Sequence, residues 1–483
     1  MIRRGARGVL PACACAFLIA QPAVSAPAAP PDDQSEVLVI RAARVYTMTG
    51  DPIDQGMVRI RDGKIEAVGK DLAVPAGAKV IERRTGILTP GLIDACCVLN
   101  AEIPQMGVQP TYPRPPRSLW LKLGEYAARH PSGEEEDDCD VKASELDPAF
   151  ASGLSPFVIW SEESSEVTPH RLVIDSVNLL SNDFARLLRG GVTTVYLSAD
   201  SANVIGARGT IVKTAGALDQ RVVRRADAVK VALGADPGRR GHANMLPSGG
   251  APTFYNRRPT TRMGVEWVFR KALYDARRSA AGGALHGADR PPEAALPVLL
   301  QMLAGEVPVR VQARMQHDIF TALRLAREFG LKFTLEEATE AYRALPQLKA
   351  AGVPVIFGPL YMDPAGWRQI AGEADRPRLN SPRQLAEAGL ELALTAQELR
   401  DEEGLVRQGM LAARYGLSAD AALRAITATP AKLLGLADQA GTLKPGTAAD
   451  LVVWSDEPLA ATSRPILVLI GGRTVLDGDQ ANR

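Results

Sequence analysis

Residues 85–100 read TGILTPGLIDACCVLN, and this stretch decides the fold. A turn at Pro90 and Gly91 leads into the apolar residues Leu92 and Ile93, which is the pattern of a short buried strand. Small and polar residues follow, starting at Asp94. In α/β barrels, catalytic groups gather at the carboxyl ends of the parallel strands. The exit of this strand is therefore where the chemistry of the protein is expected.

The middle of the chain alternates strand and helix patterns. Repetition of a β-branched run followed by an amphipathic run predicts an α/β fold with a parallel sheet. The predicted strands are residues 192–198, 307–313, 333–335, 353–357 and 392–395, and the predicted helices are 183–189, 263–278, 292–304, 318–329, 339–350 and 419–428.

Both ends of the chain carry strand patterns without helices. Residues 37–40 and 57–61 are apolar or alternating, and the Asp62-Gly63 pair after them is a strong hairpin signal. Residues 451–454, 466–470 and 473–476 form a second group of short apolar runs. All-β segments therefore bracket the α/β region.

Composition and the first residues bear on partners and location. Lys plus Arg total 56 against 55 for Asp plus Glu, so no net field favours nucleic acid. Residues 1–26 read as a secretory signal, with three early arginines, an apolar run and the cleavage pattern Val24-Ser25-Ala26. We expect a periplasmic or secreted protein. Lipidation at Cys13 is a minor alternative, and a disulfide from Cys139 to Cys96 or Cys97 is left open.

A segment of residues 101–170 breaks the strand and helix alternation. It is rich in proline and contains the acidic run 134–138, which is typical of a solvated loop. We interpret it as a long insertion on the loop face, with a docking surface as the alternative.

Several motifs resemble the metal-dependent amidohydrolase superfamily, in a branch close to imidazolonepropionase-like enzymes. They are PGLID at 90–94, GVTT at 191–194, NVIGARGTIVKT at 203–214, PTTRMG at 259–264, AITATPAKLLG at 425–435 and GTLKPGTAADLVVW at 441–454. The resemblance implies a (β/α)8 TIM-like barrel over residues 89–436, with the insertion inside it. It also implies a small β-sandwich built from residues 36–88 and 437–483.

The resemblance also implies a zinc site at five strand-end positions, and each can be checked. The positions of the former metal-site pocket are occupied by Cys96, Val98, Gln312, Glu337 and Ala396, none of which is the family's usual ligand type. A zinc site needs three or four nitrogen, oxygen or sulfur donors. Cys96 and Glu337 alone cannot supply them, so we predict no metal and no other cofactor.

Charged residues near these positions suggest what replaces the metal. We predict that Arg314 pairs with Glu336 or Glu337, with Arg314–Glu336 as the pocket charge pair. The loop residues Asn203, Arg208 and Lys213 either hold an anionic group of a ligand or form a structural turn. Lys230, inside a strand-like run, is interpreted as a lysine at the edge of the core.

Two functions remain after this reasoning. The first is a catalytically silent homologue that binds a small-molecule ligand or partners an active amidohydrolase subunit, as part of an oligomer. The alternative is a hydrolase of C–N bonds, in non-peptide or dipeptide amides, with an atypical site. For that alternative the catalytic candidates are Cys96, with its neighbour Cys97, and Glu337, although a nucleophilic cysteine requires a nearby base.

Overall fold

The computed structural model describes residues 37–98, 165–239, 259, 261–287, 290–361, 378–397, 399 and 403–478. The predicted signal peptide and most of the predicted insertion lie outside these residues. Within the described part of the chain, no helix combines the length and the apolar character that a membrane span requires.

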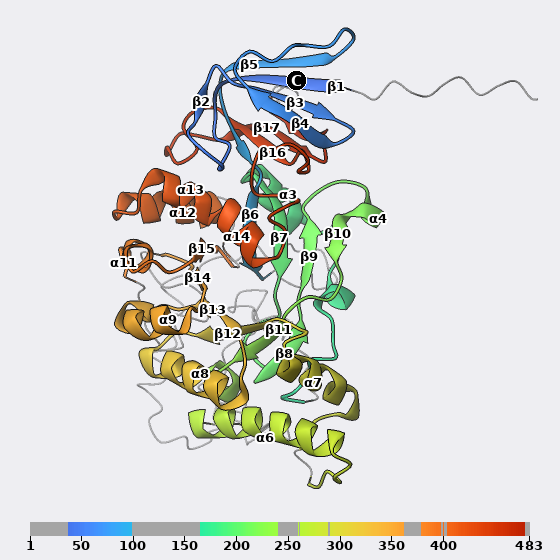
Figure 1. Ribbon diagram of the computed structural model, residues 1–483, viewed down its shortest axis with the longest axis vertical. Helices are drawn as coiled ribbons and strands as arrows, with labels where there is room; N and C mark the ends of the chain where they lie inside the picture. The colour runs from blue at the N-terminus through green and yellow to red at the C-terminus, as the bar shows by residue number, and fades with distance from the viewer. Residues whose placement is uncertain are drawn as a thin grey trace, which may run out of the picture. The chain divides into compact units, whose positions relative to one another are not determined.

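Strands from both ends of the chain share one eight-stranded sheet (Figure 1). The order is β18-β17-β16-β5-β1-β3-β4, and β2 pairs with β1. The amino-terminal strands are β1 (Val37–Val45), β2 (Ile53–Asp54), β3 (Met57–Arg61), β4 (Lys64–Gly69) and β5 (Lys79–Pro90), and the carboxyl-terminal strands are β16 (Leu451–Trp454), β17 (Pro465–Ile470) and β18 (Arg473–Asp477).

The predicted hairpin at Asp62-Gly63 is confirmed. β3 and β4 pair antiparallel, with Arg61 opposite Lys64. Asp62 and Gly63 have φ of 50° and 75°. Positive φ at both central residues is the requirement of the tight hairpin turn that matches strand twist, and Asp-Gly meets it.

The middle of the chain contributes two further sheets, in the orders β10-β9-β7-β6 and β15-β14-β13-β12-β11-β8. The pair β6–β7 and the run β11 to β15 are parallel. Among the described residues, backbone ladders do not join the two sheets into a ring. Their strands are β6 (Leu92–Cys97), β7 (Val192–Leu197), β8 (Ile205–Arg208), β9 (Thr210–Lys213), β10 (Val222–Arg224), β11 (Val229–Ala232), β12 (Val309–Ala313), β13 (Phe333–Glu337), β14 (Val355–Phe357) and β15 (Leu392–Leu394).

Helices follow these strands, as the alternation predicts. The longer ones are α3 (Asn182–Arg189), α6 (Arg262–Ala280), α7 (Leu296–Ala304), α8 (Gln316–Phe329), α9 (Leu345–Ala351), α11 (Ser381–Glu387), α12 (Leu405–Arg414), α13 (Ala419–Ala425) and α14 (Ala428–Leu433); α4 (Leu218–Arg221) and α5 (Asp236–Arg239) are single turns.

The helix predicted at 339–350 is wrong in its first half. A 3-10 turn, Ala341–Arg343, precedes α9, which has a proline in its first turn. Proline lacks the backbone N–H that an internal helical position would donate, so the α-helix begins there. The strands β8 to β10 and the helices α11 and α12 are not among the predicted elements.

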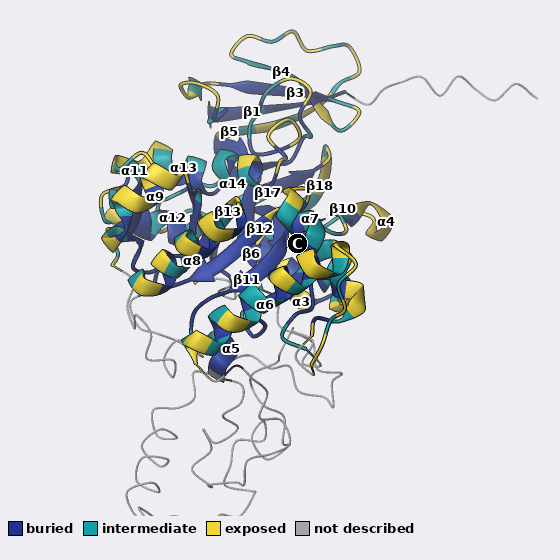
Figure 2. Cartoon of the chain, turned by 60° about the horizontal axis from the view of Figure 1, so that its bottom comes forward, coloured by how far each residue is buried: buried dark blue, intermediate teal, exposed yellow. Residues whose placement is uncertain are grey.

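Burial separates the strands from the outer helix faces (Figure 2). β6, β7, β11 and β12 are buried along their whole length, which accounts for their near-continuous apolar sequences. Charged residues inside such strands need partners, because a buried charge is stable only when it is paired. The candidate site is built from the charged residues inside these buried strands.

Candidate active site

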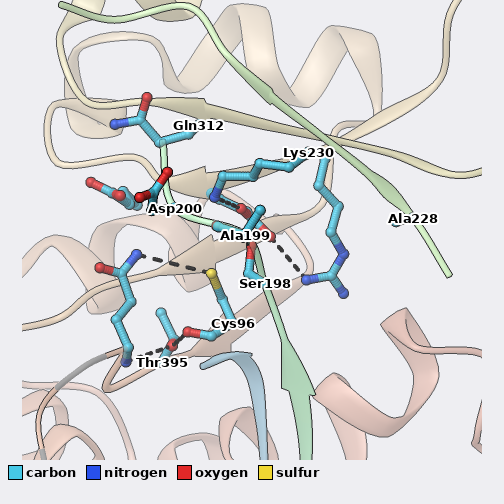
Figure 3. Close-up of polar contacts among 12 residues, drawn as sticks. Cys96, Ser198, Ala199, Asp200, Ala228, Lys230, Gln312 and Thr395 are labelled. Carbon is cyan, nitrogen blue, oxygen red and sulfur yellow. Dashed lines mark hydrogen bonds and ion pairs between the residues drawn. The ribbon is translucent and has the colours of Figure 1, made fainter. Parts of the chain in front are cut away.

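The polar residues of the buried strands lie on a common face. In the parallel ladders, Lys230 is opposite Arg310, and Gln312 is opposite Glu336. Side chains two residues apart on a strand share a face, and ladder partners point the same way. The register therefore gathers Lys230, Arg310, Gln312 and Glu336 across β11, β12 and β13. Figure 3 shows the region around Lys230 and Cys96.

Three of these residues form a buried ion cluster, which we define as Lys230, Arg310 and Glu336. Lys230 Nζ bonds Glu336 Oε2, and Arg310 Nη1 donates to Glu336 Oε1 at 2.9 Å. The side chain of Lys230 is 2% exposed and that of Glu336 is 0% exposed. One carboxylate thus uses both oxygens to hold two cations.

Aromatic and backbone groups complete the surroundings of Arg310. Its guanidinium carbon lies 3.6 Å from the centroid of the Tyr196 ring, a cation–π contact, and its Nη1 also donates to the carbonyl of Ala95. The Tyr196 hydroxyl donates to the Ala228 carbonyl at 3.1 Å. The guanidinium of Arg310 therefore contacts residues of β6, β7 and β13.

The pKa values of this cluster keep all three groups charged at neutral pH. Burial alone would raise the pKa of Glu336, but the charges of Lys230 and Arg310 outweigh it and hold that pKa below its usual value. Burial opposes the charge of Lys230 as well, yet Glu336 keeps the pKa of the lysine above its usual value. The cluster is consequently a permanent ion network rather than a proton donor and acceptor pair.

Asp94 connects β6 to the residues after β15. Its carboxylate accepts hydrogen bonds from the backbone N–H of Cys96 at 3.0 Å, the hydroxyl of Thr395 at 2.6 Å and the backbone N–H of Ala396 at 3.1 Å. Two of the predicted site positions, Cys96 and Ala396, thus contribute backbone donors to one buried carboxylate.

Arg314 makes a second cluster, and the predicted pair with Glu336 is wrong. Arg314 Nε bonds Glu337 Oε2, and its two Nη atoms contact the two oxygens of Asp236 at 2.8 Å each. We call Arg314, Glu337 and Asp236 the Arg314 cluster. The reason lies in the backbone: Glu337 has a φ of 65°, which redirects its side chain at the strand end, while Glu336 follows the ladder toward Lys230.

Cys96 is unsuited to be a nucleophile. Its side chain is fully buried, and burial, reinforced by the negative charge of Glu336, raises the pKa of the thiol well above its usual value. The thiol is therefore protonated at neutral pH, whereas the thiolate is the reactive form. The amide nitrogen Nε2 of Gln397 lies 4.0 Å from Sγ, and an amide is not a base. Cys97 is buried as well.

We expect Cys96 to react with iodoacetamide at pH 8 only after unfolding. Peptide mass spectrometry of native and urea-unfolded protein measures this directly at the residue, with Cys97 read in the same peptide. Rapid modification of Cys96 in the native protein would contradict the assigned burial and the raised pKa.

The residues at the five positions where the resemblance implies metal ligands do not fit a zinc ion. Val98 and Ala396 have no side-chain donor atom for a metal, and Glu337 is paired with Arg314. Among the described residues, no group of three or more His, Cys, Asp or Glu side chains could hold a metal ion. Gln312 occupies the remaining position with a neutral amide, which is a poor zinc ligand.

The three residues predicted to form a ligand loop contact other parts of the protein. Asn203 Nδ2 donates to Thr168 at 2.9 Å, Arg208 donates to the carbonyls of Asp227 and Ala226 at 2.9 and 3.2 Å, and Lys213 pairs with Asp450. These contacts agree with the structural-turn alternative, and the ligand role stays a prediction.

The residues predicted from the sequence do not include Arg310, Tyr196 or Asp236. Lys230 is interpreted there only as a lysine at the edge of the core. A signal was present in the strands V-R-V-Q-A and V-K-V-A, which place a charged residue inside an apolar run. Because each such charge must be paired on folding, Lys230, Arg310 and the two glutamates of β13 are natural partners. Asp236 lies in a single helical turn and carries no such signal.

Comparison with known proteins finds similarity to amidohydrolases. Residues 386–475 match the Amidohydrolase family model. The curated protein amidohydrolase tasK of Hapsidospora irregularis is 25% identical over 342 residues, covering 66% of this chain. The match spans about a third of that relative's length (34%).

Solved structures are similar over more of the chain. An amidohydrolase from Thermotoga maritima MSB8 aligns with a TM-score of 0.70 and 26% identity, covering 91% of this chain and 100% of the other. A prolidase complexed with N-methylphosphonate-L-proline aligns with a TM-score of 0.50 and 17% identity over 91% of this chain. The chain is thus homologous to amidohydrolases, with a mixed α/β fold like theirs.

Proposed function

We propose, starting from homology to amidohydrolases, that this chain is a catalytically silent relative of those hydrolases that binds a small-molecule ligand or partners an active amidohydrolase subunit. The proposal includes export, assembly into an oligomer, the imidazolonepropionase-like branch, and a barrel closed from β6 to β15 beside a β-sandwich of the two chain ends.

One observation carries the loss of hydrolysis. The network of Lys230, Arg310 and Glu336 lies against Cys96, close enough for their charges to act on its thiol. The charged groups of Lys230 and Arg310 therefore lie beside Cys96, a position where the family resemblance implies a metal ligand. An ammonium and a guanidinium cannot bind water in the way that turns it into a nucleophile at neutral pH, which is the role of zinc in hydrolases.

The charge arrangement also explains how the fold persists without a cation. Removing a metal from a set of carboxylates would leave buried charges unpaired, at a cost of several kcal/mol. Here Glu336 and Glu337 each have an arginine partner, and Glu336 also has Lys230. The carboxylates of Glu336 and Glu337 thus have cationic partners within the protein, which supports a structural rather than a catalytic role for these side chains.

Hydrolysis assays test this proposal. An Xaa-Pro dipeptide and a cyclic imide serve as substrates, the first because a structural neighbour is a prolidase. We expect no release of product above the uncatalysed rate, with or without added zinc or manganese, while a zinc-dependent amidohydrolase run in parallel is active. Saturable turnover by the purified chain would establish the alternative, a hydrolase of C–N bonds.

A further inference from the structure

The helix α6 has two apolar faces. One face packs into the core and includes the buried residues Val265 and Phe269. On the opposite face, Met263, Trp267 and Tyr274 are 79%, 48% and 50% exposed, and spacings of four and seven residues place them in one stripe. Figure 2 shows exposed residues along α6. An amphipathic helix of a monomer needs only the first of these faces.

The neighbouring helix α8 extends the exposed stripe. Arg262 pairs with Asp318 at 2.7 Å, and Thr321 donates to Glu266 at 3.3 Å, so the start of α8 lies against the start of α6. Phe320, between these two contacts in the sequence, is 36% exposed. Contiguous exposed apolar side chains mark interaction sites more often than single ones do. We define the α6 surface as Met263, Trp267, Tyr274 and Phe320.

A paired cation lies within the stripe. Arg270 follows Trp267 by three residues and precedes Tyr274 by four, and its side chain is 30% exposed. It pairs with Glu266 at 3.0 Å and with Glu328 at 2.9 Å, both in the same chain. The flat face of a guanidinium held in this way can still stack on an aromatic ring. The stripe therefore presents a cation between two aromatic side chains.

The order of these residues fits a second copy of α6 that runs in the opposite direction. In a two-fold dimer, if residue i contacts residue j, then j contacts i. An antiparallel pair of α6 helices centred just after Val268 places Met263 opposite Tyr274 of the second copy. It places Trp267 opposite Arg270 of the second copy. A methionine sulfur on an aromatic ring and a guanidinium on tryptophan are both favourable contacts, and each occurs twice.

We propose that the α6 surface is the interface of a homodimer in which the α6 helices of two copies pack antiparallel across a two-fold axis. The helix has 19 residues and is therefore about 28 Å long, enough for several layers of side chains to meet across the axis. The inference rests on the oligomer that the proposed function includes, and it names the surface through which that oligomer forms.

Sedimentation equilibrium of the full chain tests the interface. We expect a reversible dimer with a dissociation constant in about the micromolar range, since one helix pair makes a small interface. Trp267→Glu places a carboxylate near the two-fold axis and should weaken dimerisation by about thirtyfold or more, as for the loss of a central aromatic anchor. The control is Leu180→Glu, at a residue that is 73% exposed outside the α6 surface, and it should leave dimerisation unchanged.

Cysteine substitutions test the antiparallel register independently, and they do so even if Trp267→Glu does not fold. A mixture of Met263→Cys and Tyr274→Cys chains should form a disulfide between these two positions under mild oxidation, read by peptide mass spectrometry. Met263→Cys alone should not, because the two copies of position 263 lie about 16 Å apart along the helix axis. A disulfide requires Cα atoms within about 7 Å of each other.

The remaining outcomes overturn the interface. They are a monomer at every concentration, which would leave the α6 surface to a different protein, a dimer unaffected by Trp267→Glu, and a disulfide formed by Met263→Cys alone. None of them alters the hydrolysis assay. Turnover in that assay overturns the silent relative and leaves the dimer as it is.

Discussion

Replacing Glu336 with glutamine is expected to lower the free energy of unfolding by about 3 to 5 kcal/mol. The substitution leaves Lys230 and Arg310 buried without the carboxylate that holds both of them. Breaking a buried pair from one side costs far more than the pair contributes, because the remaining charge cannot recover its hydration. The midpoint of urea unfolding, followed by circular dichroism, measures the change.

The matched control is Glu387→Gln on α11. Glu387 pairs with Arg383 at 2.7 Å, but both side chains are more than half exposed. An exposed pair of this spacing contributes about 0.3 to 0.5 kcal/mol, so the control should hardly move the midpoint. Equal effects of the two substitutions would show that Glu336 is not the centre of a buried network.

Acid should reduce the difference between native protein and Glu336→Gln. The pKa of Glu336 lies below its usual value because the charges of Lys230 and Arg310 outweigh the effect of burial. A carboxyl group with a lowered pKa in the folded state contributes stability above its unfolded pKa of about 4.3, and loses it as pH falls through the folded pKa. The two midpoints should therefore draw together as pH falls below about 4.3.

Arg314→Met is the second substitution with a large expected effect. It removes the guanidinium that contacts both Glu337 and Asp236. We expect a loss of about 3 kcal/mol, at the lower end for a buried pair, because the Asp236 side chain is 19% exposed and water can compensate in part. The melting temperature and the urea midpoint should both fall.

Arg383→Met provides the control for Arg314→Met, since it removes an arginine from an exposed pair of similar length. Its expected effect is below about 1 kcal/mol. An unchanged melt for Arg314→Met would refute the idea that this arginine takes over the electrostatic role of a cation at the strand ends.

Much of the fold could be predicted because it depends on local patterns. The Asp62-Gly63 turn requires two positive φ angles, and the β-branched run at 192–198 can form little other than a buried strand. The short strands β8 to β10 could not be predicted in the same way. They are three or four residues long, which is too short to show a period in the sequence. Only their antiparallel pairing with other strands identifies them.

The site was harder to predict than the fold. The five positions where the family resemblance implies metal ligands could be named, but the partner of each charge depends on register and on backbone angles. Glu336 and Glu337 are neighbours in sequence, yet Glu336 binds Arg310 while Glu337, at the strand end with a φ of 65°, binds Arg314. Asp236 reaches Arg314 from 78 residues away, and no local pattern marks it.

The metal content of the purified chain tests the central claim most directly. The protein is produced in zinc-supplemented medium, purified without chelators, and analysed for zinc and manganese per chain by mass spectrometry. We predict far less than one ion per chain, because Glu337 is paired with Arg314, Val98 and Ala396 have no side-chain donor atom for a metal, and Cys96 alone cannot hold a zinc ion. Close to one tightly held ion per chain would contradict it.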